Sequence, residues 1–340
     1  MRRAFLAMIV LALAVMAVGC PCARNAVNAS PELRWWLFSN FGASQICPEM
    51  MKRGVPLKLP QLGAASVGRF FPQTCNVVVD DGRQAIVVTM NGSGYVNLPV
   101  TRRVGFWVSM GVEYLPDFRL LEDSIYVWGR FNRFVNQPDM RIMGVENPVV
   151  NLATQTPAGT VANVIGNSVV ASEIGRGFTV VRQDDGDDFA IGHLEPPEKP
   201  KRQFVAGKGH VVLASDLTEV RAASRDYLGP FEIADNDAAL FFKARVQNAP
   251  VIFAIVERSV GETWRRTYET AQPMGAPPGP IMGQGTMAPG EVNLRFPLNK
   301  GTYYFVVENN APAPFQPLGV PLPVHESIAY VSYSAEVGER

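Results

Sequence analysis

Thiol and imidazole groups are the side chains with the greatest scope for chemistry in this sequence, which has 340 residues, four cysteines and three histidines. No Cys-x2-Cys pair, neighbouring histidine or HExxH segment accompanies them, so their spacing does not support a zinc site. The nearest approach to a serine nucleophile turn, Gly92-Ser93-Gly94, lacks the Gly-x-Ser-x-Gly spacing. Distant Asp, Ser and His residues could still converge in the fold, but no local pattern predicts an enzyme or a cofactor.

An acidic turn offers a second kind of chemistry. Four aspartates surround one glycine in the segment Asp184–Asp188, and hard cations such as Ca²⁺ bind several carboxylates. The segment is shorter than the twelve-residue calcium loop and lacks its terminal glutamate. We therefore interpret it as the exposed turn of a hairpin between Phe178–Val181 and Phe189–Leu194, and we predict no metal site.

The first nineteen residues have the pattern of a targeting signal. Arg2 and Arg3 precede an uncharged run from Ala4 to Gly19, which is shorter than the roughly 20 residues that span a bilayer. A basic start followed by an apolar run and small residues is typical of a signal peptide. We expect residues 1–19 to be removed and exclude them from the fold.

The residues at the end of this run, Ala17-Val18-Gly19-Cys20, resemble the lipobox of bacterial lipoproteins. The resemblance implies cleavage before Cys20 and attachment of a thioether-linked diacylglycerol, usually with an amide-linked acyl chain, to that residue. Several acyl chains make a stable anchor, unlike a single myristoyl group. Pro21 stands where an acidic residue often signals inner-membrane retention, which favours the outer membrane. An ordinary secreted protein is the alternative.

The remaining cysteines predict one disulfide. Export brings the chain into an oxidising compartment, and lipidation of Cys20 leaves three thiols. Cys47 and Cys75 flank a 27-residue stretch and lie in segments with the pattern of folded structure, so we predict that they are joined. Cys22 belongs to an expected flexible tether, residues 20–30, and the odd count leaves it free or intermolecular.

Composition limits the class of protein further. The 31 basic and 31 acidic side chains give zero net charge, which argues against a nucleic-acid partner. A hydrophobic content of 47% is sufficient for real cores and excludes a disordered polymer. The length favours two domains.

The first of these is expected to be an α+β domain, residues 31–195. Ser30-Pro31-Glu32 predicts a helix start, and the tryptophans that follow either close a core or lie at the membrane interface. A second short helix is expected from Pro48 to Arg53. Between Asn76 and Val88 a hairpin is expected around Asp80-Asp81-Gly82-Arg83, with Gly82 supplying a positive φ. Further strands are expected at 95–98, 105–113 and 124–134.

A long helix is expected between Pro157 and Gly175, against this sheet, although a pair of strands is the alternative because the segment is rich in β-branched residues. Large apolar side chains of the sheet and helix could enclose an acyl chain, with the lining formed by Phe106, Trp107, Tyr126, Trp128, Phe131, Val161 and Ile165. Ordinary core packing explains the same residues. A cavity above roughly 300 Å³ would favour a carrier, whereas a filled core would favour an adaptor.

A charged, proline-rich segment, Glu195–Arg202, marks the boundary between the expected domains. We assign residues 196–203 to a stiff linker. Because it contributes little apolar surface, few core contacts should cross it, and residues 204–340 are expected to fold alone.

The second domain, residues 204–340, has the pattern of an antiparallel β-sandwich, with short β-rich runs separated by turn residues. Strands are expected at 210–215, 218–222, 228–233, 239–246, 251–257, 291–297, 301–308 and 328–336. The segment Gln272–Gly290, dense in Gly, Pro and Met, is expected to be a mobile surface loop. The run Gly301–Asn309, after the alternating Val292–Phe296, resembles the late strands of jelly-roll accessory domains in secreted bacterial proteins, which implies a jelly-roll-like fold.

The sequence therefore predicts a mainly β protein: an N-terminal α+β domain, with an antiparallel sheet and one long helix, followed by a jelly-roll-like antiparallel β-sandwich. The expected function is that of a cell-envelope lipoprotein with a non-catalytic adaptor, structural or binding role. Its expected partners are the membrane, through the lipid on Cys20, and another envelope protein or a glycan. A carrier of lipid or another apolar ligand is the alternative, and a hydrolase is the least favoured class.

Overall fold

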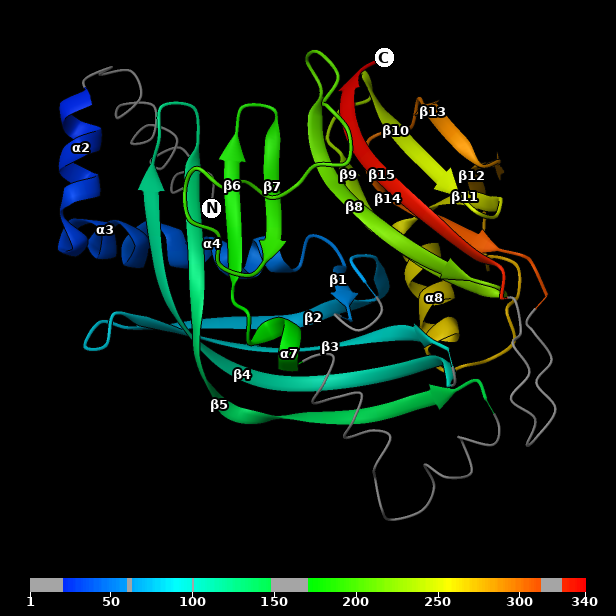
Figure 1. Ribbon diagram of the computed structural model, residues 1–340, viewed down its shortest axis with the longest axis horizontal. Helices are drawn as coiled ribbons and strands as arrows, with labels where there is room; N and C mark the ends of the chain where they lie inside the picture. Colours follow the sequence, from blue (N-terminus) through cyan, green and yellow to red (C-terminus); the bar gives the residue numbers. More distant parts are fainter. Residues whose placement is uncertain (1–20, 60–62, 100, 148–170, 313–325) are drawn as a thin grey trace.

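The computed structural model of the chain describes residues 21–59, 63–99, 101–147, 171–312 and 326–340. The described residues form one sheet of eleven strands, one sheet of four strands and several short helices. This arrangement confirms a mainly β fold in which a helix-containing N-terminal half precedes a β-sandwich (Figure 1). None of the helices in these ranges combines the length and the apolar character needed to cross a bilayer.

Short helices open the described chain: α2 (Pro21–Ala29), α3 (Pro31–Leu37), the π-helical turn η1 (Phe38–Gly42) and α4 (Ala43–Met50). Ser30 caps α3, since its hydroxyl accepts a hydrogen bond from the Leu33 amide, and Pro31 occupies the first turn as predicted. The expected helix 48–53 begins earlier, at Ala43, and contains Pro48.

The expected flexible tether, residues 20–30, differs from the structure because α2 covers most of it. The side-chain amide of Asn28 holds this helix against the sheet: Nδ2 donates to the carbonyl oxygen of Leu120 at 2.8 Å, and Oδ1 accepts from the Leu120 amide at 3.0 Å. The sequence does not predict this contact, because the segment lacks the regularly spaced large apolar side chains that indicate a packed helix.

The N-terminal sheet is antiparallel. It begins with the short strand β1 (Val55–Lys58) and continues with the long strands β2 (Ser66–Asp80), β3 (Ala85–Leu98), β4 (Arg102–Leu120) and β5 (Ile125–Val145). The predicted hairpin is present between β2 and β3, with Val79 opposite Ile86. The positive φ in its turn is at Gln84 rather than Gly82. The strands are longer than predicted because glycines and polar residues, such as those of Asn91–Gly94, continue the pairing.

The described chain resumes at residue 171. There, α7 (Ala171–Ile174) leads to a second hairpin, β6 (Phe178–Gln183) and β7 (Gly186–Ile191). The predicted hairpin is present, but the expected exposed turn Asp184–Asp188 is only partly correct. β7 begins at Gly186, and Asp188 is buried within it, where it accepts from Arg202. Most of the expected helix 157–175, including Val161 and Ile165, lies outside the described residues.

The C-terminal half is an antiparallel sandwich. One layer contains β8 (Val211–Arg221), β15 (Ile328–Glu339), β10 (Ala238–Gln247) and β13 (Gly290–Phe296), in that order. The other contains β9 (Ser224–Ile233), β14 (Gly301–Asn309), β11 (Val251–Glu257) and β12 (Ile281–Met287). Phe242 from the first layer and Phe305 from the second stack at 3.8 Å between ring centroids, so aromatic packing joins the layers.

Three features of the second half differ from the sequence prediction. The runs 210–215 and 218–222 form one strand, β8, and the expected mobile loop 272–290 contains β12. Gly283 and Gly285 weaken the strand signal of β12, yet a Cβ on Gly285 would lie 2.9 Å from the Phe253 ring, so the glycine leaves room for that ring.

Helix α8 (Arg258–Glu269) is the third difference, because that segment gave no helix prediction. Its buried positions follow helical spacing, but a glycine and an arginine among them dilute the apolar pattern: Gly261, Trp264, Arg265 and Tyr268. The helix packs on β3 and β4 of the N-terminal sheet and on β9, β11 and β14 of the sandwich. In Figure 1 it stands between the two sheets.

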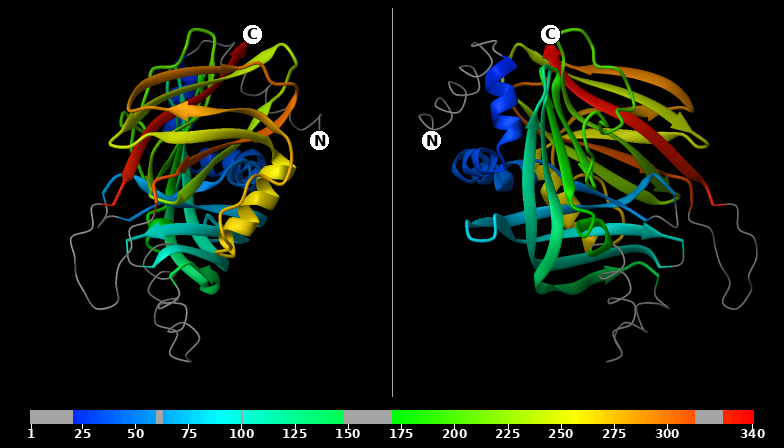
Figure 2. Two further views of the ribbon diagram at one scale, coloured as in Figure 1. Left: turned by 90° about the vertical axis from the view of Figure 1, so that its right-hand side faces the viewer. Right: turned by 60° about the vertical axis from the view of Figure 1, so that its left-hand side comes forward.

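The two halves are joined more closely than the proline-rich segment predicts. Gly186 of β7 pairs with Val212 of β8, and Ser66 of β2 pairs with Thr218 of β8, so the large sheet continues across the boundary. The Gly54 amide also donates to the Gly229 carbonyl at 2.9 Å. A cluster of buried aromatic residues also contains members from both halves. Core contacts therefore do cross the boundary, and the two views in Figure 2 show the sandwich set directly against the N-terminal sheet.

Candidate functional site

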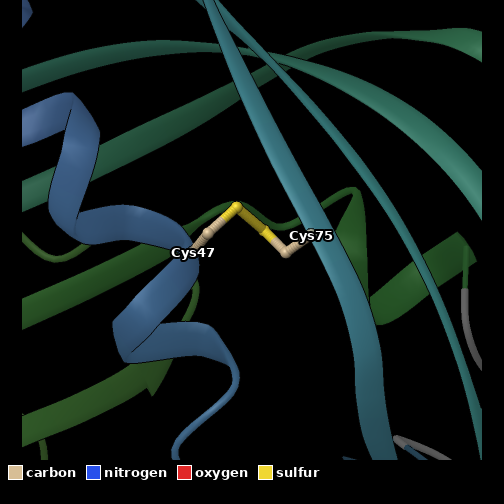
Figure 3. Close-up of a disulfide and its surroundings, with 2 residues drawn as sticks. All are labelled: Cys47 and Cys75. Atoms are coloured by element: carbon tan, nitrogen blue, oxygen red, sulfur yellow. A yellow bond between two sulfur atoms is a disulfide. The ribbon is translucent and has the colours of Figure 1, made fainter.

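The disulfide predicted from the sequence is present (Figure 3). It joins Cys47 of α4 to Cys75 of β2, whose Cα atoms lie 5.4 Å apart. Cys22 is exposed and unpaired, and Cys20 lies outside the described residues. The bond ties the N-terminal helices to the second strand of the sheet.

The five described aromatic residues of the expected apolar lining do not gather around one cavity. Phe106 is fully buried and packs in the main N-terminal core, to which Phe131 contributes from its edge. The Arg141 guanidinium lies over the Trp107 ring, and its Cζ is 5.5 Å from the ring centroid. Tyr126 and Trp128 belong to a separate small cluster with Val181. None of these residues lines the cavity beside His210 or the smaller one beside Asn248 and Tyr330.

The larger cavity opens where the acidic turn meets the segment that follows the proline-rich stretch. Its volume is about 660 Å³. Its walls are the tip of the β6–β7 hairpin and the residues leading into β8, namely Asp184, Asp185, Arg202, Gln203, Phe204, Val205, Ala206, Gly207, Gly209, His210 and Val211. We refer to it as the linker cavity.

One wall of the linker cavity is fixed by Arg202. Its two terminal nitrogens donate to the carboxylate oxygens of Asp185 at 2.6 and 2.9 Å, and its Nε donates to Asp188 at 2.6 Å. Hydrogen bonding to Arg202 lowers the pKa of Asp185, whereas burial raises the pKa of Asp188. Asp187 accepts from Arg182 at 2.9 Å. Three of the four carboxylates of the acidic turn thus form ion pairs with arginines.

A second wall of the linker cavity contains His210, which contacts a fully buried carboxylate, Glu336. His210 Nδ1 lies 3.0 Å from Glu336 Oε2, which also accepts from the Gly207 amide at 2.9 Å. Lys243 Nζ lies 2.9 Å from Oε1, which the Ser334 hydroxyl also approaches at 3.2 Å. Burial alone would raise the pKa of Glu336, but these donors outweigh it and hold the pKa below its usual range.

A carboxylate-oriented imidazole supplies two of the three parts of a hydrolytic triad. The third part is missing from the linker cavity as described, because none of its lining residues carries a hydroxyl or thiol. The nearby Ser334 hydroxyl is bonded to Glu336 itself. Within the described ranges, no three His, Cys, Asp or Glu side chains are grouped as metal ligands. The arrangement therefore offers polar and aromatic contacts to a ligand rather than a nucleophile.

The other histidines do not join this site. His193 lies beside Trp128, with ring centroids 5.4 Å apart, and its Nε2 is 3.2 Å from Glu195, while His325 lies outside the described residues. Sequence reasoning missed the grouping of His210, Lys243 and Glu336 because strand pairing between β10 and β15 creates it: Phe241 is opposite Glu336 and Lys243 is opposite Ser334.

Comparison with known proteins assigns no family. No protein-family model matches the chain, and no curated protein is significantly similar to it. Its function is therefore inferred from its own sequence and geometry.

Proposed function

We propose that the chain is a lipid-anchored protein of the bacterial cell envelope, with a non-catalytic binding or adaptor role toward a protein or glycan. Pro21, in place of an acidic residue after Cys20, assigns it to the outer membrane. Support for export comes from the basic and apolar N-terminal run, and support for the anchor comes from Ala17-Val18-Gly19-Cys20. The Cys47–Cys75 disulfide carries the proposal, because disulfides persist in oxidising compartments and are rare in the cytosol.

The linker cavity is the binding surface we assign to this role. It combines the Phe204 ring and His210 imidazole with carboxylates and with the backbone of a loop, which are the groups that stack on and hydrogen-bond to polar ligands. Arg202 and Glu336 are fixed by ion pairs and hydrogen bonds, so both walls are preorganised. The absence of a hydroxyl or thiol among the described lining residues favours binding without covalent chemistry.

Acylation is tested by comparing Cys20→Ala with Cys22→Ala in cells that export the full chain. Metabolic labelling with palmitate and partition into detergent should be lost in the first variant and retained in the second. Equal labelling of both variants would show that Cys20 is not the acylated residue.

Binding is tested by placing a photoreactive amino acid at Val205, which lines the linker cavity and is 88% exposed, and at Val78, which is 54% exposed on β2. Irradiation of intact envelopes should give a discrete adduct from position 205 that is absent from position 78. Substitution of His210 by Ala should reduce that adduct. The same pattern at both positions, or no adduct at 205, would contradict a binding role for the cavity.

A further inference from the structure

An exposed apolar surface lies on the helices that follow the proposed anchor. Leu33 and Trp36 are one turn apart on α3 and are 36% and 53% exposed. The Trp36 ring meets the Phe41 ring edge-on at 5.9 Å. We call Leu33, Trp36 and Phe41 the helical apolar patch. Of all aromatic side chains in the described ranges, Trp36 alone is exposed.

The patch cannot turn inward, because the other face of α3 is fixed in the fold. Arg34 is buried and its Nε donates to Asp117 at 2.7 Å, while its Nη1 donates to the Asn28 carbonyl at 2.6 Å. Phe38, one turn further on, packs in the main N-terminal core. Trp36 is therefore held outward, at an energetic disadvantage in water that apolar contact would relieve.

The helices that carry the patch contribute few charges of their own. From residue 21 to residue 46 the sequence has three charged side chains, Arg24, Glu32 and Arg34. Arg34 is neutralised by Asp117 inside the molecule, which leaves Arg24 and Glu32 on the helices themselves. Asp81 of the β2–β3 turn is a charged group in contact with a neighbouring ring, since it accepts from Trp35 Nε1 at 3.0 Å. An exposed indole on helices with so few charges, beside an indole whose N–H is hydrogen-bonded, suits the membrane–water interface, where Trp is favoured between apolar and polar surroundings.

The patch is also close to the proposed acylated residue. Cys20 immediately precedes Pro21, the first residue of α2, and a helix of nine residues is about 13 Å long. Only Ser30 separates α2 from α3, and its cap fixes the joint. In Figures 1 and 2 these helices lie on one side of the molecule, with the sandwich on the other.

We propose that the helical apolar patch rests in the interface of the same bilayer that holds the acylated Cys20. This inference depends on the proposed lipid anchor. The acyl chains and α3 are then two attachments on one rigid half of the protein, and together they fix its orientation. The sandwich, including the wall of the linker cavity formed by His210, is directed away from the lipid.

The experiment uses the acylated full-length protein reconstituted in phosphatidylcholine vesicles, with and without bromine on the acyl chains near the headgroup. Brominated lipid should quench part of the tryptophan fluorescence, and Trp36→Phe should remove most of that quenching. Trp107→Phe is the matched control, because Trp107 is partly covered by Arg141 on another part of the sheet and should leave the quenching intact. Equal melting temperatures would verify that both variants are folded.

The outcomes separate the patch from the anchor. Protein that does not float with the vesicles would disprove the anchor itself. Protein that floats but shows no quenching specific to Trp36 would overturn the patch proposal and leave the anchor standing. Protection of Trp36 from aqueous acrylamide in native envelopes, without quenching by brominated vesicles, would assign the patch to a protein partner instead and would also overturn the proposal.

Discussion

Arg69 of β2 and Asp226 of β9 form a buried ion pair between the two halves of the chain. Arg69 Nε lies 2.9 and 3.0 Å from the two carboxylate oxygens of Asp226, and both residues are 2% exposed. The Tyr95 and Thr218 hydroxyls also donate to this carboxylate, at 2.6 and 2.7 Å. Donors from both halves thus satisfy one buried negative charge.

Removal of Arg69 is expected to weaken the whole fold. In Arg69→Met the carboxylate of Asp226 loses its counter-charge while staying buried, which should lower the free energy of unfolding by about 3 to 5 kcal/mol. Urea denaturation measures the loss, and adding Asp226→Leu should restore part of it. The control is Arg245→Met, whose ion pair with Glu291 is exposed and should contribute less than about 1 kcal/mol. Similar losses in both single variants would argue against the buried pair as a special contact.

The docking of α8 should depend on the missing side chain at Gly105. A Cβ there would lie 1.6 Å from the carbonyl oxygen of Glu269, at the end of α8. Gly105→Ala should therefore displace the helix and destabilise the protein by roughly 3 kcal/mol. Gly111→Ala, on the same strand, meets nothing closer than 3.5 Å and should change stability by less than about 1 kcal/mol. Thermal unfolding followed by circular dichroism distinguishes them.

The Cys47–Cys75 bond should stabilise the fold by restricting the unfolded chain. Replacing both cysteines by Ala is expected to lower the free energy of unfolding by about 3 to 4 kcal/mol in the chain-entropy model. Cys22→Ser should have no such effect, because Cys22 is exposed and unpaired. Chemical denaturation with and without reductant provides the measurement. A wild-type protein insensitive to reductant under unfolding conditions would contradict this expectation.

Acid should weaken the hydrogen-bonded carboxylate beneath His210. Because the folded pKa of Glu336 is below its usual value of 4.5, its contribution is complete above that pH and is lost as the pH falls through the lowered pKa. Glu336→Gln should therefore lower stability at pH 7 by about 2 kcal/mol, and the difference from wild type should shrink in acid. Glu291→Gln, at an exposed ion pair, is the control. A difference that does not vary with pH would refute this assignment.

The isolated segment 204–340, which the sequence alone predicts to fold independently, is now expected to be unstable. It would retain Asp226 without Arg69 or the Tyr95 hydroxyl. It would also expose the face of α8 that packs on β3 and β4. A purified fragment should lack a cooperative melting transition, whereas a sharp transition with all-β circular dichroism would restore the original expectation.

Local patterns account for what the sequence predicts well. Alternating β-branched residues around Asp80–Arg83 and Asp184–Asp188 identify both N-terminal hairpins, because the turn and its strands are neighbours in the chain. The cysteine count identifies the disulfide. The Ser30 cap identifies the start of α3.

Contacts between distant segments account for what the sequence does not predict. Arg69 and Asp226 are 157 residues apart, and His210 and Glu336 are 126 residues apart. Neither pair has a spacing that a local pattern can detect. The linker cavity likewise depends on a contact between Arg202 and Asp185. The sequence therefore predicts a domain boundary at the proline-rich stretch but does not predict that this stretch lines a cavity.

The position of β15 has a consequence for how the chain reaches its final form. This strand, Ile328–Glu339, follows all the other described strands in the chain, yet it lies between β8 and β10 and pairs with both. Before β15 joins the sheet, it cannot cover the edges of β8 and β10 that face it. Unpaired strand edges are sites of aggregation. A chain that stops before Ile328 would lack the strand that covers both edges, so truncation there is expected to promote aggregation.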